Sequence, residues 1–79
     1  MAFFIEIVKI SEDAHSAEFV FGTDENHRGR FRFDKENSEA TSLQECPGDD
    51  RQRLLSRAVH KVKQSWQTGV LPEKTCWAS

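Results

Sequence analysis

Two cysteines and three histidines carry the most reactive side chains of this 79-residue chain. Cys46 precedes an expected helix, and a helix N-terminus can lower the pKa of a thiol and so favour the thiolate nucleophile. A nucleophilic cysteine also needs a positioned base, and the sequence shows none. His15, His27 and His60 show no metal-ligand spacing. We therefore expect no catalytic residue, no metal site and no cofactor, and predict that the protein is not an enzyme.

The two cysteines leave one structural question open. They are too few for a disulfide scaffold, although the residues between Gly69 and Cys76 could bring Cys76 within reach of Cys46. No apolar run approaches the roughly 20 residues of a membrane-spanning helix. No basic leader precedes the first apolar residues, so we read no signal peptide. We expect a cytoplasmic protein with two free thiols and no membrane contact.

A basic ridge is the strongest candidate for a binding surface. Its cations follow at i, i+4, i+7 and i+8, with one more to the side: Arg53, Arg57, His60, Lys61 and Lys63. This spacing places them on the back of a helix. No Asp or Glu occurs between Arg51 and Pro72, whereas a purely structural face would normally mix Glu with Lys for i,i+4 support. The ridge could bind phosphate groups or an acidic partner, or form only a solvated helix face.

The formal charge divides the chain into two parts. Residues 1–50 hold 12 Asp/Glu and 5 Lys/Arg, a balance of −7, whereas residues 51–79 have a balance of +5. Such asymmetry bears on partners rather than on fold. The acid-rich turns of the first part are open to two interpretations. They could meet a basic protein partner, as in an inhibitor, or serve solubility alone.

Both tryptophans lie in the last fourteen residues. Trp66 continues the apolar stripe of the expected helix, so we expect it in the core. Trp77 stands in the tail. It would be a hot spot for binding if exposed, or a tail anchor if buried.

The elements expected to position these residues begin with a meander of strands. Phe3–Ile10 carries apolar side chains on both faces, which favours a central or doubly covered strand. In Glu18–Gly22 and Arg30–Asp34, Phe alternates with other residues. A hairpin around the loop Thr23–Gly29 therefore has four Phe on one face and its charges on the other. Ala40–Glu45 is a weaker strand, expected at an edge.

Pro47-Gly48 separates these strands from a helix expected over residues 50–68. Asp49 is the predicted N-cap, with Gln52 in the capping-box position. Gly69 fits a left-handed helix end, which Pro72 then blocks from continuing. The apolar residues of the helix form one stripe, whose obvious target is the Phe face of the sheet: Leu54, Leu55, Ala58, Val59, Val62 and Trp66. Residues 70–79 are expected to return along the sheet or the helix.

We predict a single small globular α+β domain over residues 1–79. It is an antiparallel meander of three or four strands followed by one long C-terminal helix packed on one sheet face. The predicted function is protein binding without catalysis, as in an adaptor, regulatory or inhibitor-type module. The alternative is nucleic-acid binding through the basic back of the helix. The candidate binding residues are Arg53, Arg57, His60, Lys61, Lys63 and Trp77. The outer sheet face with its edge strand offers a second docking route, and we expect a monomer or a weak dimer.

Overall fold

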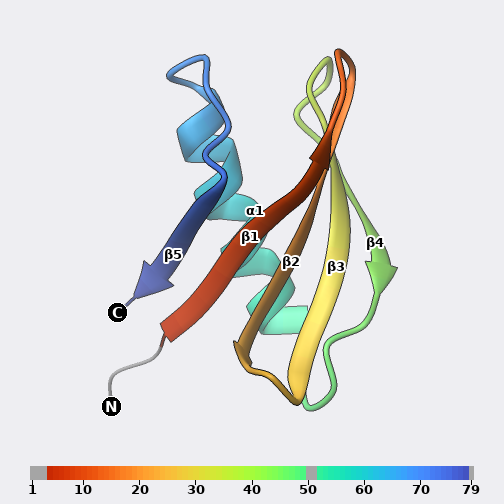
Figure 1. Ribbon diagram of the computed structural model, residues 1–79, viewed down its shortest axis with the longest axis vertical. Coiled ribbons are helices and arrows are strands. Elements are labelled where there is room, and N and C mark those ends of the chain that lie inside the picture. Colours follow the sequence, from red (N-terminus) through yellow and green to blue (C-terminus); the bar gives the residue numbers. More distant parts are fainter. Residues whose placement is uncertain (1–3, 50–51, 79) are drawn as a thin grey trace.

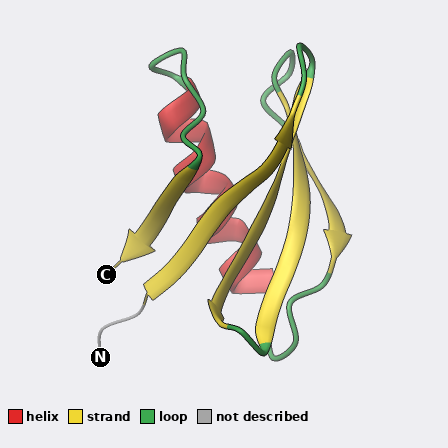
Figure 2. Ribbon diagram, viewed as in Figure 1, coloured by secondary structure: helices red, strands yellow, loops and turns green. Residues whose placement is uncertain are grey.

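The computed structural model describes residues 4–49 and 52–78, which form a five-stranded antiparallel sheet and one helix (Figure 1). The elements in chain order are β1 (Phe4–Glu12), β2 (Ser16–Asp24), β3 (His27–Asp34), β4 (Ala40–Gln44), α1 (Arg53–Trp66) and β5 (Lys74–Ala78). The strand order is β4-β3-β2-β1-β5, so the first four strands form a meander. Figure 2 shows α1 lying across one face of the sheet. The predicted α+β fold, a meander with a C-terminal helix on one face, is confirmed, although the sheet has five strands rather than three or four because the tail adds β5.

Four phenylalanines of the β2–β3 hairpin form the centre of the core. Phe19, Phe21, Phe31 and Phe33 are at most 1% exposed. Phe19 lies opposite Phe31 in the register, and their stacked rings have centroids 5.4 Å apart. This Phe face continues onto β1 and meets α1 through four more buried side chains: Ile5, Ile7, Ala58 and Val62. The predicted Phe face and its packing against the helix are confirmed.

The hairpin itself is longer than predicted. The expected loop Thr23–Gly29 is reduced to a turn between Asp24 and His27. The carboxylate of Asp24 accepts the backbone N–H of Asn26 at 2.8 Å and contacts Nδ1 of His27 at 2.8 Å. A short acidic side chain that bonds the backbone two residues later is a typical way to close such a turn.

The tail returns along the sheet, one of its two predicted paths, and forms a strand there. β5 pairs antiparallel with β1 and places Trp77 opposite Ile5. The segment just before β5 also bonds to Lys9 of β1. The backbone N–H of Lys9 donates to the carbonyl oxygen of Glu73 at 2.7 Å, and its Nζ donates to the carbonyl oxygen of Leu71 at 3.2 Å. β1 therefore lies between two strands, as its apolar residues on both faces predict.

The start of α1 differs from the predicted capping box. Gln52 directly precedes α1 and has a left-handed φ of 57°, so it is not the third helical residue; residues 50–51 lie outside the described part of the chain. Asp49 still accepts the N–H groups of Leu54 at 2.8 Å and Leu55 at 3.2 Å. It thereby satisfies two of the donors that a helix start leaves unpaired. α1 is not long and apolar enough to cross a membrane.

Two glycines shape the connections at the ends of α1. Beyond its end, Gly69 adopts the predicted left-handed φ, 92°. Before α1 begins, the chain that leaves β4 passes close to Gly29 of β3. A Cβ at Gly29 would lie 2.7 Å from the carbonyl oxygen of Gln44 and 2.9 Å from the backbone nitrogen of Cys46. Both contacts are with backbone, so a side chain at Gly29 would displace the end of β4.

We expect Gly29→Ala to lower the free energy of unfolding by about 1–3 kcal/mol, because overpacking against backbone forces a shift of the structure. Urea denaturation followed by tryptophan fluorescence measures this change. The control is Thr41→Ala, an exposed position on β4, which should change the free energy by less than about 0.5 kcal/mol. Equal stability of Gly29→Ala and wild type would contradict the close crossing.

Candidate functional site

The structure divides the predicted basic ridge between two flanks of α1. Three of the five ridge residues are exposed, namely Arg53, His60 and Lys63, whereas Arg57 and Lys61 are half-buried. Successive helical residues point about 100° apart, so Lys61 and Lys63 lie about 200° apart around the helix. Lys63 lies on the flank that faces β4, beside Val59. The other flank faces β5, where the guanidinium carbon of Arg57 lies 5.0 Å from the centroid of the Trp77 ring.

Arg57 and Trp77 are the predicted site residues that the structure brings together. Trp77 is half-buried and packs against the core. Arg57 lies over its ring at a distance typical of a cation–π contact. This pair joins β5 to α1, which favours the tail-anchor interpretation of Trp77. Trp66, likewise half-buried, packs against the core as expected.

An open groove lies between β4 and the flank of α1 that carries Lys63. β4 is an edge strand (Figure 1), and α1 packs mainly against the other four strands. Ala40 and Ser42 lie opposite buried Phe in the register and so share the helix-facing side. Both are small, and two neighbouring cavities of about 360 and 510 Å³ share Ser42 and Leu55. We call this space the β4–α1 groove.

The β4–α1 groove has an apolar floor and charged ends. Leu55, Val59 and Ala40 are half-buried and form the floor. Glu45 and Asp49 line the end near the start of α1. Three further charged or titratable side chains line the opposite end: Glu39, His60 and Lys63. The groove therefore combines an apolar surface with side chains that can distinguish a basic from an acidic ligand.

Cys46 lies at the Glu45–Asp49 end of the groove and is buried. Its burial, and then the negative charges of Asp49 and Asp24, raise the pKa of the thiol. The expectation that the helix N-terminus lowers this pKa is therefore wrong, and the environment disfavours a thiolate nucleophile. Cys46 and Cys76 are both free thiols. The described residues contain no group of three or more His, Cys, Asp and Glu side chains that could hold a metal ion.

The opposite face of the sheet carries basic residues that pair with neighbouring acids. Arg28 donates to Glu6 at 3.0 Å, and Arg30 donates to Glu18 at 3.3 Å. The hydrogen bond from Arg28, followed by the charge of Lys74, holds the pKa of Glu6 below its ordinary value. These cations lie on the face away from α1, so one flat surface cannot use the basic residues of both the sheet and the helix.

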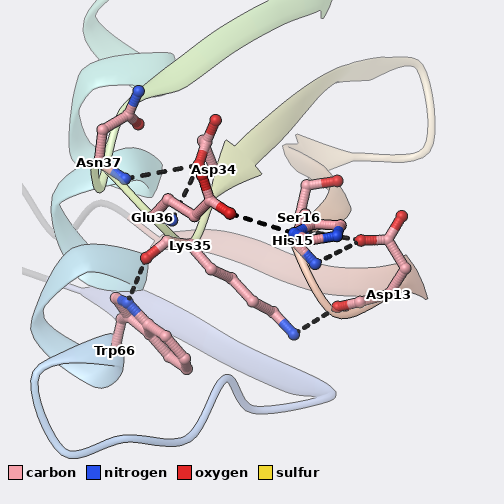
Figure 3. A network of polar contacts seen from close by, with 8 residues as sticks. All are labelled: Asp13, His15, Ser16, Asp34, Lys35, Glu36, Asn37 and Trp66. Carbon is pink, nitrogen blue, oxygen red and sulfur yellow. Dashed lines mark hydrogen bonds and ion pairs between the residues drawn. The ribbon is translucent and has the colours of Figure 1, made fainter.

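Polar contacts hold the end of α1 against the β1–β2 and β3–β4 turns (Figure 3). Nε1 of Trp66 donates to the carbonyl of Lys35 at 3.2 Å. Nζ of Lys35 donates to the carbonyl of Asp13 at 2.6 Å and pairs with the Glu12 carboxylate at 2.6 Å. The turn that leads into β4 is thus tied both to the helix and to the neighbouring turn. This arrangement sets the position of β4 relative to α1 at the Lys63 end of the groove.

The sequence pattern alone does not reveal the β4–α1 groove. Helical spacing assigns Leu55 and Val59 to the buried stripe, but both are only half-buried because β4 presents no large side chain to them. The available signal is the pair of small residues at alternate positions of an edge strand, Ala40 and Ser42. These two small residues indicate a groove only when the position of the helix relative to β4 is known.

Comparisons with protein-family models, with curated proteins and with solved structures return no match to this chain. The candidate site is therefore assigned from its own geometry and chemistry.

We expect Lys35→Met to raise the pKa of Glu12. Hydrogen bonds from Lys35 and Lys9 hold the pKa of the Glu12 carboxyl below its ordinary value. A carboxyl whose pKa is lowered by folding contributes stability above its unfolded pKa of about 4.3, and that stability is lost as the pH falls through the lower folded-state pKa. The substitution should therefore weaken the rise in stability between acidic and neutral pH.

NMR titration of the Glu12 side chain measures its pKa, and urea denaturation between about pH 2 and 6 measures the stability. The control is Lys74→Met, because Lys74 pairs with Glu6 rather than with Glu12. It should leave the Glu12 pKa unchanged. The same Glu12 pKa in wild type and Lys35→Met would contradict the network at this turn.

Proposed function

We propose that this protein is a protein-binding module whose β4–α1 groove receives an extended segment of a partner protein. One observation carries the proposal: a strand edge lies directly beside an open groove with an apolar floor. Among the described strands, β4 pairs with β3 alone. Its other edge offers backbone donors and acceptors, and Leu55 and Val59 offer apolar surface next to that edge.

Strand addition is the binding mode that uses both features. The added backbone bonds the free edge, while alternate side chains enter pockets that give specificity. Side chains two residues apart along such a segment point to the same face, about 6.8 Å from one another. Segments placed along β4 would therefore direct alternate side chains toward Leu55 and Val59.

A bulge limits how much of β4 can pair. Arg30 lies opposite Gln44 and Phe31 opposite Ser42, so Leu43 is the extra residue on β4. Bulges disrupt the ladder locally and increase its twist. The regular part of the edge is therefore Ala40–Ser42. An interface this short supports transient rather than permanent association.

Nucleic-acid binding through the basic back of α1 fits the structure less well. Arg57 and Lys61 are half-buried, and Lys63 lines the same cavity as Glu39. Phosphate groups are repelled by such acids. Nucleic-acid binding by Arg53, Arg57, His60, Lys61 and Lys63 is the alternative that the following experiment must exclude.

We expect Ser42→Tyr to abolish capture of the partner, because a large side chain at Ser42 enters both cavities of the groove. The matched control is Thr41→Tyr, on the same strand but on the opposite face of the sheet. Wild type and both variants are immobilised and exposed to lysate of cells that express the protein, with and without nuclease treatment. Quantitative mass spectrometry should find a protein retained by wild type and Thr41→Tyr and reduced at least about tenfold with Ser42→Tyr.

Circular dichroism and thermal unfolding establish that both variants fold. Equal retention by all three proteins would place the binding surface outside the groove. Retention that disappears on nuclease treatment would favour the nucleic-acid alternative, and no retained protein would contradict the proposal outright.

A further inference from the structure

The charges along the β4–α1 groove point to the chemistry of its occupant. Among the described residues that line it, three are carboxylates: Glu39, Glu45 and Asp49. Lys63 is the one Lys or Arg among the described residues of that lining, so the carboxylates outnumber it three to one. The groove is therefore net acidic, and its most acidic end is the one lined by Glu45 and Asp49.

The environment of Cys46 adds one more carboxylate, Asp24, to this end of the groove. Cys46 lies at the Glu45–Asp49 end, and its thiol pKa is raised by burial and also by the negative charges of Asp49 and Asp24. Asp24 is the last residue of β2, next to the β2–β3 turn. Negative charge from the end of β2 and from the connection between β4 and α1 thus gathers at one end of the groove.

A second copy of this chain is a poor occupant. An antiparallel pair of β4 strands from two copies would bring two net-acidic grooves to one seam, each lined by Glu39, Glu45 and Asp49. Like charges brought close together across a strand pair are destabilising. The carboxylates that flank β4 therefore protect its edge against self-association, and the same carboxylates attract a strand that carries Lys or Arg.

We propose that the occupant is an extended basic segment of a partner protein that runs antiparallel to β4. It places a basic side chain beside Glu45 and Asp49 and apolar side chains on Leu55 and Val59. This inference rests on the proposed function and adds to it the chemistry and the direction of the partner.

The antiparallel direction follows from the rest of the sheet, which is antiparallel throughout, and from the greater stability per residue of antiparallel pairing. β4 runs from the Lys63 end of the groove to the Glu45–Asp49 end. An antiparallel segment therefore begins at the acidic end. Its basic residues precede its apolar residues, at alternate positions.

Three labelled peptides with blocked ends test this order. The forward peptide is Arg-Thr-Arg-Thr-Val-Thr-Val, the reversed peptide is Val-Thr-Val-Thr-Arg-Thr-Arg, and the third replaces both Arg of the forward peptide by Glu. Fluorescence anisotropy at low salt measures binding to the full chain. We expect the forward peptide to bind at least about tenfold more tightly than either of the others. Equal binding of the forward and reversed peptides would overturn the direction, and tighter binding of the Glu peptide would overturn the charge.

Two protein variants with the same change in charge locate the contact. Glu45→Lys should weaken the forward peptide at least about fivefold, because it reverses a charge at the acidic end of the groove. Glu73 is exposed at the far side of the sheet, just before β5. Glu73→Lys makes the same change in net charge there and should leave the affinity of the forward peptide within about twofold of wild type, because distance and salt weaken the effect of a charge there. Equal weakening by both variants would indicate attraction by net charge alone and would overturn the proposed placement.

The Ser42→Tyr variant separates a failure of this inference from a failure of the proposed function. If the forward peptide does not bind but Ser42→Tyr still loses the captured partner, the occupant is wrong and the groove function stands. If the forward peptide binds wild type and Ser42→Tyr equally, its site lies outside the groove and this inference fails, whereas the groove function fails only if Ser42→Tyr also retains the captured partner.

Discussion

The packing of four phenylalanines against α1 is the constraint on which the rest of this structure depends. Phe19, Phe21, Phe31 and Phe33 are almost completely buried, and removing one such ring costs about 3–5 kcal/mol. A chain of this length has about 4–12 kcal/mol of stability in total. The β2–β3 hairpin and the stripe of α1 therefore specify each other, because neither can leave its apolar face in water.

The groove is a geometric consequence of that packing. A helix about 10 Å across cannot cover five strands whose outermost members lie about 19 Å apart. α1 lies over the Phe face, and the Arg57–Trp77 contact joins it to β5 on one side. On the other side β4 presents Ala40 and Ser42, which are too small to fill the space beside Leu55 and Val59. Within the predicted basic ridge, Arg57 and Lys61 are half-buried, and Arg53, His60 and Lys63 are exposed.

The fold could be predicted largely because its signals are local. Phe alternates with other residues along two short segments, and the apolar stripe of α1 repeats at helical spacing, so the hairpin, the helix and their contact follow from neighbouring residues. β5 could not be predicted, because Lys74–Ala78 becomes a strand only by pairing with β1 at the other end of the chain. The groove depends on which strand lies beyond the edge of the helix. That is a property of the assembled sheet rather than of any segment.

Amide hydrogen exchange resolved by NMR tests most directly whether β4 has a free edge beside the groove. If the edge is free, the amides of Phe19 and Phe31 exchange only on global unfolding, whereas alternate amides of Ala40–Gln44, those directed away from β3, exchange close to the intrinsic rate. Uniform protection along β4 at the level of Phe31 would show that this edge is already covered. It would then contradict the assignment of β4 as an open docking strand.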